Sequence, residues 1–380
     1  MKAGWATKTI ADVCSVVNGG TPKTGVSEYW DGAHQWITPA EMGKRSTPYI
    51  AKTERTITDA GMQNSSARLL PPLSVILSSR APIGHLVINT EPMATNQGCK
   101  GLVPSDELDH KYLYYYLSSI VQLLNDLGTG ATFKELSGGK LKEVPIPVPP
   151  LPEQQRIVAT LDDAFAGIST ARAAAEQNRQ NARALFESHL QSVFSQRGEG
   201  WVKTTIDKIS TNLDNKRIPI TKSDRKAGKY PYYGASGIVD YVEGYIFDGD
   251  TLLVSEDGAN LLARSTPIAF SVTGKYWVNN HAHILKFESM ATQRFVEFYF
   301  ASIRLDEYIT GAAQPKLNQK ALNSIPIPIP TAVEMQAEIV ERIESMQEET
   351  QRLEALYQRK LDALDELKQS LLHQAFSGQL

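Results

Sequence analysis

The two halves of this 380-residue sequence repeat each other, and this repeat restricts the fold more than any other feature does. The proline-rich run Pro145–Pro149 recurs as Pro326–Pro330, and the pair Leu136 and Leu141 recurs at the same offset as Leu317 and Leu322. The remaining matches flank these runs: Gly4-Trp5 with Gly200-Trp201, Glu153-Gln154-Gln155 with Glu334-Met335-Gln336, and Val193-Phe194-Ser195 with Ala375-Phe376-Ser377. A repeat of this length predicts two copies of one structural unit.

Each copy begins with a lobe of short apolar runs that are separated by glycine, proline and aspartate. Such runs are typical of strands between turns, and apolar residues at helical spacing add one helix to each lobe. The predicted strands are 73–77, 85–88, 251–254 and 284–287, and the predicted helices are 112–124 and 295–303. Proline fixes φ and disfavours helix at the preceding residue, so the proline-rich run that ends each lobe should be extended.

A long helix follows each proline-rich run, because apolar residues recur there in alternating steps of four and three. Sustained over about 44 residues, or roughly 65 Å of helix, this pattern is typical of a coiled coil. Small alanines in the first seam suit a close partner, most simply the other helix of the same chain. The predicted seam positions are Ile157, Leu161, Ile168, Leu185, Ile339, Ile343, Leu353, Leu364, Leu367 and Leu371.

These elements predict an α+β chain in four parts. The two mixed lobes occupy residues 1–150 and 200–330, and the two coiled-coil helices occupy residues 151–199 and 331–380. No apolar run approaches the roughly 18–20 residues of a membrane span, and the N-terminus lacks the apolar stretch of a signal peptide. Cys14 and Cys99 match no zinc or redox spacing, so free thiols in a reducing cytoplasm are expected.

The net charge of −3 argues at first against a nucleic-acid-binding protein. The excess of acidic over basic side chains, however, lies mainly in residues 331–380, with 10 acidic against 5 basic side chains. Residues 1–150 carry 14 basic and 13 acidic side chains, and residues 200–330 carry 15 and 13. Because salt screens charge within about 10 Å, near-neutral lobes with basic loops remain compatible with DNA binding.

Catalytic motifs are missing from the sequence. It contains no phosphate-binding loop of the G-x-x-x-x-G-K-[ST] type, no glycine-rich cofactor fingerprint after a strand, and no methyltransferase Asn/Asp-Pro-Pro-Tyr/Phe run. His281 and His283 lie two residues apart without an evident third ligand, so a structural or binding role is favoured over a metal site. Glu256 and Asp257 are adjacent at a strand end and should point apart, which argues against paired acid–base work.

The loops instead offer basic and hydrogen-bonding side chains. The segment 216–229 holds six basic residues against one acid and leads into two tyrosines. Lysine and arginine suit phosphates and guanine edges, and asparagine and glutamine suit adenine edges. A solvated loop explains any one of these residues as well, but the clusters together favour DNA. The predicted DNA contacts are Thr21, Lys23, Thr24, Lys44, Arg45, Ser79, Arg80, Asn96 and Gln97 in the first lobe, and Lys216, Arg217, Lys222, Arg225, Tyr232, Tyr233, Asp257, Asn260, Asn280 and His281 in the second.

Taken together, the repeat and its motifs resemble the specificity subunit of type I restriction-modification enzymes over the whole chain. The resemblance rests on the connector 144–158, on the closing run Gln374-Ala375-Phe376-Ser377-Gly378 and on four shorter runs. These are Gly19-Gly20-Thr21-Pro22, Trp36-Ile37-Thr38-Pro39-Ala40, Gly130-Ala131-Thr132-Phe133-Lys134 and Tyr233-Gly234-Ala235-Ser236-Gly237.

The resemblance implies two target-recognition domains, each followed by a helix, with the helices pairing as an antiparallel coiled coil of pseudo-two-fold symmetry. Each domain would read one half of a split, asymmetric site in double-stranded DNA. Two methyltransferase (M) subunits would supply S-adenosylmethionine chemistry on adenine, and restriction (R) subunits would supply ATP- and magnesium-dependent translocation and cleavage. This chain would itself bind no cofactor and perform no catalysis. The second copy departs at residues 311–316, Gly-Ala-Ala-Gln-Pro-Lys, which puts identical methyltransferase contacts in doubt.

Two other functions compete with this interpretation. In the first, the coiled coil is an interaction scaffold and the lobes bind protein, so selection from random duplexes should enrich no sequence. In the second, the chain is a self-contained DNA methyltransferase, which the missing motifs disfavour and which predicts methyl transfer by the purified chain alone.

Overall fold

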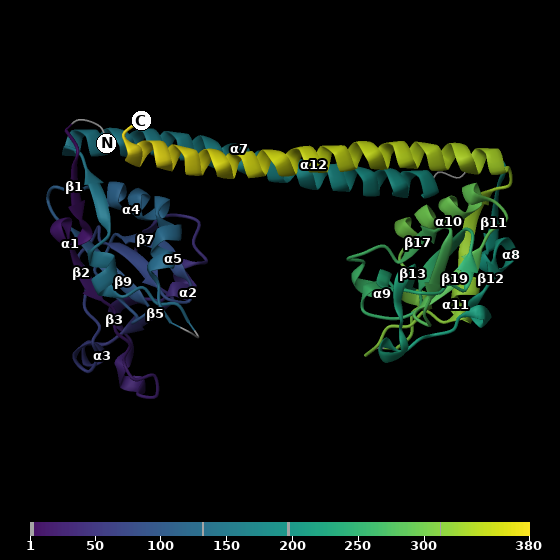
Figure 1. The fold of residues 1–380 in the computed structure, drawn as a ribbon, viewed down its shortest axis with the longest axis horizontal. Helices are drawn as coiled ribbons and strands as arrows, with labels where there is room; N and C mark the ends of the chain where they lie inside the picture. Colours follow the sequence, from purple (N-terminus) through teal and green to yellow (C-terminus); the bar gives the residue numbers. More distant parts are fainter. Residues whose placement is uncertain (1–3, 131–132, 196–197, 312) are drawn as a thin grey trace. The chain divides into compact units, whose positions relative to one another are not determined.

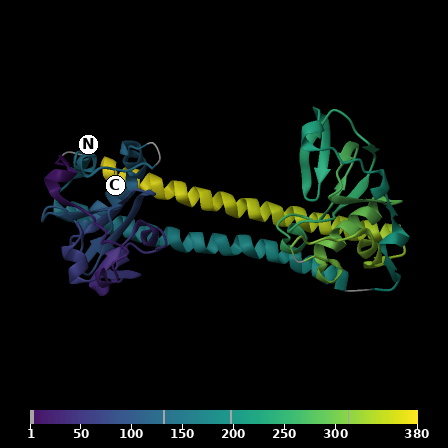
Figure 2. The same ribbon diagram turned by 90° about the horizontal axis from the view of Figure 1, so that it is seen from below.

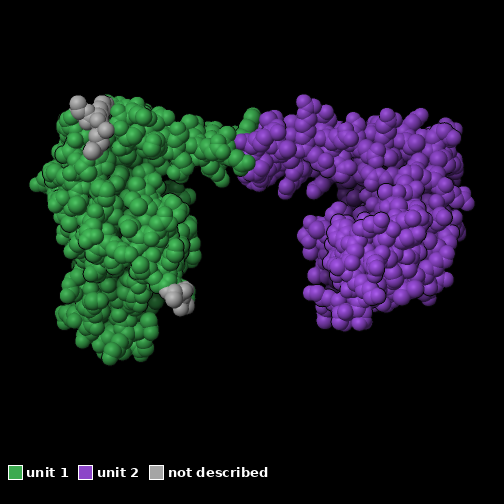
Figure 3. Space-filling view, viewed as in Figure 1, with its two compact units in different colours: residues 1–174, 360–380 green, residues 175–359 purple. Residues whose placement is uncertain are grey.

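The computed structural model describes residues 4–130, 133–195, 198–311 and 313–380 (Figure 1). The chain divides into two compact units (Figure 3). Unit 1 comprises residues 1–174 and 360–380, and unit 2 comprises residues 175–359. Each unit therefore contains one lobe together with part of each long helix, α7 (Leu151–Ser195) and α12 (Val333–Ser377). Among the helices of the described ranges, none is long and apolar enough to cross a membrane.

A five-stranded sheet forms the core of the lobe in unit 1. Its order is β2 (Cys14–Asn18), β9 (Cys99–Pro104), β6 (Val75–Ser79), β7 (Ile83–Asn89) and β4 (Tyr49–Ile50). The central strand β6 is buried at every residue, in keeping with its apolar start, and α4 (His110–Ser119) packs on β6 and β7. A second, smaller sheet has the order β5 (Arg55–Ile57), β3 (Trp30–Ile37) and β8 (Met93–Thr95).

Unit 2 repeats this core. Its main sheet has the order β12 (Thr211–Asn212), β19 (Ala282–Lys286), β16 (Thr251–Ser255) and β17 (Ala269–Val272), and α10 (Met290–Ser302) packs on β16 and β17. The four predicted strands correspond to β6, β7, β16 and β19, so those predictions are confirmed; the first predicted helix is divided into α4 and α5 (Val121–Leu127).

The second sheets of the two units differ. The second sheet of unit 2 has the order β14 (Gly237–Val242), β13 (Ala227–Gly234), β18 (Lys275–Val278) and β15 (Phe247–Asp248). Figure 2 shows β13 and β14 as a long hairpin at one edge of this unit. The common part of the repeat is therefore the main sheet with its helix, and the variable part is the second sheet.

The proline-rich run of each copy is extended, as predicted, and closes the lobe against its first strand. In unit 1, β10 (Pro145–Val148) pairs antiparallel with β1 (Ala6–Thr9). In unit 2, β20 (Pro326–Pro330) pairs antiparallel with β11 (Trp201–Thr205). Alternating proline is compatible with a two-stranded ladder, because only every second N–H of an antiparallel edge strand points towards its partner.

A buried glutamine fastens the start of each long helix to this joint. Gln154 is 0% exposed; its side-chain amide donates to the carbonyl oxygens of Glu107 (2.9 Å) and Pro149 (2.8 Å), and its oxygen accepts from the Asp109 N–H (2.8 Å). Gln336 of unit 2 repeats the contact by donating to the Pro330 carbonyl at 2.7 Å. A buried glutamine thus sets where each helix leaves its lobe, one residue after Glu153 in the first copy and two residues after Glu334 in the second.

Within each unit the two long helices pair antiparallel. In unit 2, Arg179 donates to Gln358, and one turn later Arg183 bonds Glu354 at 2.6 Å. The contact moves forwards along α7 while it moves backwards along α12, which is the antiparallel relation. In unit 1, Lys368 lies 5.3 Å from the ring centroid of Phe165, and Arg172 bonds Asp365 at 2.5 Å, so the same relation holds.

Most of the predicted seam positions are buried or half-buried, but the prediction is wrong for Leu185 and Leu367, which are 52% and 46% exposed. By contrast, Ile157, Leu161 and Ile343 are 0% exposed. Near their ends, the helices also pack against the lobes. Phe186, Leu190 and Phe194 join the core of unit 2, and Leu371, Leu372, Ala375 and Phe376 join that of unit 1. This contact turns the buried face away from Leu185 and Leu367. The other predicted positions, Ile168, Ile339, Leu353, Leu364 and Leu371, are half-buried.

The joint glutamine gives a direct test of this packing. Gln154→Leu leaves the buried Pro149 carbonyl and the part-buried Glu107 carbonyl and Asp109 N–H without this partner, so we expect it to lower the free energy of unfolding by about 2–3 kcal/mol. For a unit of this size that corresponds to a fall of about 5 °C or more in the thermal midpoint. The matched control is Gln155→Leu, because Gln155 is the exposed neighbour on the same helix turn. Equal midpoints for the two variants, measured by circular dichroism, would show that the joint bonds are not stabilising.

Candidate nucleic-acid interface

In unit 1, three loops meet at the end of the central strand β6. The Ser79 N–H donates to the Gly98 carbonyl at 2.7 Å, which attaches the loop before β9. The Leu136 N–H donates to the Ser79 carbonyl at 2.8 Å, and Arg80 forms a β-bridge with Glu135, which attaches the third loop. We name this meeting point the loop junction of unit 1: residues 79–83, 96–98, 129–130 and 133–135. Residues 131 and 132 of the Gly130–Lys134 run lie outside the described residues.

Unit 2 forms the same junction with the same backbone bonds at the end of β16. The Glu256 N–H donates to the His281 carbonyl at 2.9 Å, and the Leu317 N–H donates to the Glu256 carbonyl at 2.8 Å. Asp257 forms a β-bridge with Lys316. The loop junction of unit 2 is thus residues 256–260, 279–281, 310–311 and 313–316, with residue 312 outside the described part of the chain. The match makes three pairs of positions equivalent: Arg80 with Asp257, Gly98 with His281, and Glu135 with Lys316.

An asparagine turn with identical geometry presents the middle loop in both units. The Asn96 side-chain oxygen accepts the Gly98 N–H at 2.8 Å, and the Asn279 side-chain oxygen accepts the His281 N–H at 2.8 Å. Asparagine commonly stabilises a turn by bonding the backbone two residues on. The residues at the two tips, Gln97 and Asn280, are exposed. The repeat therefore conserves the turn and changes the side chains that the turn displays.

The junctions collect eight of the predicted DNA contacts, which lie far apart in the sequence. These are Ser79, Arg80, Asn96 and Gln97 in unit 1, and Asp257, Asn260, Asn280 and His281 in unit 2. Two further predicted groups lie beside the junction of unit 1. The loop that carries Thr21, Lys23 and Thr24 is attached through the Gly20 N–H to the Thr95 carbonyl (2.8 Å), and α2 (Pro39–Met42), which leads to Lys44 and Arg45, approaches Gly98.

Two of the predicted contacts are corrected by their burial, and two more form ion pairs with neighbouring carboxylates. Ser79 and Tyr232 are 0% exposed, and the Tyr232 hydroxyl accepts the Ile220 N–H at 3.0 Å. The Arg217 side chain bonds Glu256 at 2.6 Å, and that of Arg225 bonds Asp240 at 3.2 Å. The side chains of Ser79 and Tyr232 are therefore not available to a duplex, whereas DNA contact by Arg217 and Arg225 stays a prediction. The strand β13 turns Tyr232 inwards, a direction that a short run of tyrosines does not reveal.

The remaining predicted contacts keep exposed or half-exposed side chains, and DNA contact by them stays a prediction. Several are held by neighbours. Lys44 pairs with Glu54 at 3.0 Å, Arg45 with Glu41 at 3.7 Å, and Asn260 accepts the Thr266 N–H at 3.0 Å. Lys23, Thr24, Lys216 and Lys222 are exposed, and Thr21 and Tyr233 are half-buried.

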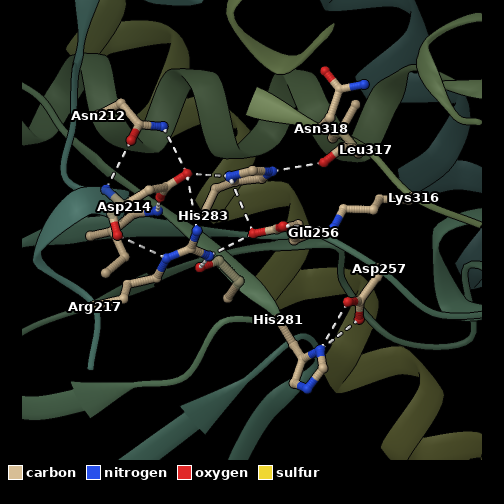
Figure 4. Close-up of polar contacts among 12 residues, drawn as sticks. Asn212, Asp214, Arg217, Glu256, Asp257, His281, His283, Lys316, Leu317 and Asn318 are labelled. Atoms are coloured by element: carbon tan, nitrogen blue, oxygen red, sulfur yellow. Dashed lines mark hydrogen bonds and ion pairs between the residues drawn. The ribbon is translucent and has the colours of Figure 1, made fainter. Parts of the chain in front are cut away.

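A buried ion-pair network lies beneath the junction of unit 2 (Figure 4). His283 is 1% exposed; its Nε2 lies 2.7 Å from the Leu317 carbonyl oxygen, and its Nδ1 lies 2.5 Å from Asp214. A carbonyl oxygen only accepts, so Nε2 carries a proton. Glu256 pairs with Arg217 at 2.6 Å and with Lys316 at 3.2 Å. The network joins β16, β19, the segment after β12 and the third loop of the junction.

The charge state of the network follows from its contacts. Burial alone would raise the pKa of Asp214, but the hydrogen bond and positive charge of His283, with the Ile284 N–H and Arg217, outweigh burial and hold that pKa below its usual value. Asp214 is therefore ionised at neutral pH, and His283 carries protons on both ring nitrogens. The pKa of Glu256 is likewise lowered: burial opposes ionisation, and Arg217, His283 and Lys316 overcome it.

The same residues have the composition of a metal site, but their pairing argues against one. One ligand atom each from Asp214, Glu256 and His283 lie within 4.8 Å of one another. A divalent cation needs an unprotonated histidine nitrogen and available carboxylate oxygens. In this network two cationic side chains and an imidazolium already neutralise both carboxylates. The cluster is thus a structural ion-pair network, which sequence reasoning missed because Asp214 and Lys316 are far from His283 in the chain.

The exposed counterpart of this network is the pair Asp257 and His281 (Figure 4). The two Asp257 oxygens lie 2.8 and 3.0 Å from Nδ1 of His281, whose side chain is 45% exposed. Glu256 and Asp257 therefore point in different directions, as the sequence predicts. Glu256 serves the buried network, and Asp257 orients a histidine at the surface.

Acid titration tests the buried network. Because the folded-state pKa of Asp214 lies below the ordinary 3.8, its stabilising contribution is complete above that pH and is lost as pH falls through the folded-state pKa. We expect Asp214→Asn to lower stability by about 3 kcal/mol at pH 7, since it breaks a buried pair, and the difference from the unsubstituted protein to shrink below about pH 4. Asp250→Asn, at an exposed position, is the control. A difference in thermal midpoint that stays constant from pH 7 to pH 3 would refute this assignment.

The sequence of this chain is similar to those of known proteins. Residues 2–177 and 198–361 match the family model of the type I restriction modification DNA specificity domain. The specificity subunit of the type I restriction enzyme MjaIX of Methanocaldococcus jannaschii is 41% identical over 159 residues, which cover 41% of this chain and 37% of that protein. The EcoprrI specificity subunit of Escherichia coli is 25% identical over 340 residues, which cover 85% of this chain and 82% of that protein.

Two solved structures share the fold at low sequence identity. The HsdS subunit from Thermoanaerobacter tengcongensis is 15% identical, with a TM-score of 0.62, over 100% of this chain and 98% of that one. A chain from work on complex assembly and conformational transition of the type I R-M system is also 15% identical, with a TM-score of 0.80, over 100% of this chain and 99% of that one. At such identity the likeness shows the fold alone.

Proposed function

The chain belongs to the type I restriction modification DNA specificity family, and on that premise we propose that it selects the DNA sites at which partner subunits act. The observation that carries the proposal is the repeated loop junction. The same backbone bonds and the same asparagine turn occur in both units, while the displayed side chains differ. A conserved frame with variable side chains suits two domains that read two different short sequences.

The chemistry of the displayed side chains supports direct readout of base edges. Unit 1 offers the guanidinium of Arg80 and the amide of Gln97, and unit 2 offers Asn280 and His281. Arginine and the amide side chains bind guanine and adenine edges in the major groove. Exposed lysines near the junctions, such as Lys23 and Lys216, suit phosphates, which position a protein without specifying sequence. The proposed target is one asymmetric double-stranded site in two parts.

The catalytic work belongs to partner subunits in this proposal. Two methyltransferase subunits would supply S-adenosylmethionine, and restriction subunits would supply ATP- and magnesium-dependent translocation and cleavage. The chain itself would bind no cofactor and perform no catalysis. The acidic end, with 10 acidic against 5 basic residues in 331–380, predicts weak DNA affinity for the isolated chain that rises when methyltransferase subunits bind. Tight, specific binding by the chain alone would contradict this division of work.

The long helices are proposed to set the distance between the two half-sites. Inserting one heptad between Ala174 and Ala175 and another between Arg359 and Lys360 keeps the helix pairing within each unit. Seven helical residues add about 10.5 Å, or about three base pairs. We expect the preferred spacer to lengthen by about that number while both half-sites keep their sequences. An unchanged spacer, or changed half-sites with the old spacer, would refute the role of the helices.

Selection from random DNA duplexes by the chain assembled with its methyltransferase subunits tests the function as a whole. We expect enrichment of a two-part motif with different halves and a fixed spacer. The scaffold alternative predicts that no sequence is enriched. Methyl transfer by the purified chain alone would instead favour the self-contained methyltransferase, and the same preparations can be assayed for it.

A further inference from the structure

At two neighbouring positions of the loop junction, the backbones of the two units are equivalent but the side chains are different. Where unit 1 has Arg80 and Gly98, unit 2 has Asp257 and His281. A long residue opposite glycine in one copy thus becomes a short residue opposite an imidazole in the other. In both units these side chains stand at the end of the central strand, beside the exposed tip of the asparagine turn.

In unit 1 the spot is filled by Arg80. A Cβ atom built on Gly98 would lie 3.3 Å from Cγ of Arg80 and 3.2 Å from both Oδ1 of Asn96 and Cγ of Pro39, so the arginine stem packs beside the glycine and leaves little room for a side chain there. Nη1 of Arg80 donates to Glu135 at 3.4 Å, and the two side chains are 35% and 41% exposed. The carboxylate holds the guanidinium at the surface and offsets part of its charge, which favours a directed contact over a diffuse one with phosphates.

In unit 2 the same spot is filled by His281. Asp257 binds Nδ1 of the ring, and a carboxylate only accepts there, so Nδ1 carries the proton. In the neutral ring, Nε2 is then a hydrogen-bond acceptor. Asp257 is a positioning residue, because its own side chain is only 16% exposed and acts through the ring, which is 45% exposed.

We propose that Arg80 and the Asp257-held His281 are equivalent base-reading positions of the two units. Arg80 reads a guanine, whose O6 and N7 accept from the guanidinium. His281 reads a base whose exocyclic amino group donates to Nε2, that is, adenine or cytosine. The two half-sites therefore differ at the base step that faces this spot. This inference rests on the proposed function and names the residues that make the half-sites different.

Selection from random duplexes with variant chains, each assembled with its methyltransferase subunits, tests the assignment. Arg80→Ala should reduce the preference for guanine at one position of one half-site by about tenfold to a hundredfold. The other half-site and the spacer should stay the same. His281→Ala should relax one position of the opposite half-site to a similar extent. The matched control is Lys8→Ala on β1, because the Lys8–Glu107 ion pair has similar exposure, 34% and 47%.

The positioning role of Asp257 needs a readout that a merely structural role would not change. Asp257→Asn lets an amide replace the acceptor beside Nδ1, so the tautomer of His281 is no longer fixed. We expect it to relax the same position as His281→Ala, whereas Asp257→Glu should restore the preference. Relaxation over the whole half-site, without rescue by glutamate, would overturn this role.

Transplanting the pair gives a gain-of-function test. Arg80→Asp with Gly98→His places the side chains of unit 2 at the equivalent positions of unit 1, and the preferred base at the guanine position should change to adenine or cytosine.

If the unsubstituted complex enriches no motif, the proposed function itself fails. If it enriches a two-part motif that Arg80→Ala leaves unchanged, only the present inference fails. If a variant loses all binding, the unsubstituted complex is tested instead, in competition binding with duplexes that carry a base substitution at one half-site position at a time. If replacing each guanine of the half-sites in turn leaves the affinity unchanged, the role of Arg80 is refuted.

Discussion

The antiparallel pairing of a proline-rich strand with the first strand of its lobe is the contact on which the rest of the structure depends. It closes each lobe, and it delivers the chain to a long helix at a fixed place through a buried glutamine. Because the joint occurs twice, both lobes are attached to their helices in the same way. Duplication of this joint, more than any single core contact, allows the rest of the two lobes to diverge.

The two lobes differ mainly outside the main sheet and the backbone bonds of the loop junction. Four strands of the main sheets follow the same order in both units, with β4 as an additional strand in unit 1, and the second sheets differ in strand number. At the loop junction the backbone bonds are equal, but the supporting chemistry is not. Unit 2 rests on a buried network around His283 and Glu256, whereas unit 1 uses the surface pair of Arg80 and Glu135. The third loop is thus held in both copies by ion pairs, with acid and base exchanged between Glu135 and Lys316.

Much of the fold could be predicted from the sequence because it depends on repeat and periodicity. The repeat gave the order of lobes and helices, and local apolar runs gave β6, β7, β16 and β19. The exposed Leu185 and Leu367 could not be foreseen, because helix periodicity does not say where a lobe adds a second packing surface. Tyr232 failed for a related reason: the direction of a strand residue depends on the sheet around it. The junction itself needs contacts such as Arg80 with Glu135, 55 residues apart, which no local pattern contains.

The central claim is that two units with the same backbone arrangement recognise two different DNA sequences and so select the site at which partner enzymes act. Mapping N6-methyladenine across the genome of cells with and without this chain tests it most directly. The account predicts that methylation at one asymmetric two-part motif, with unlike halves and a constant spacer, disappears when the chain is removed. A methylation pattern that stays the same without the chain, or a motif with two identical halves, would contradict it.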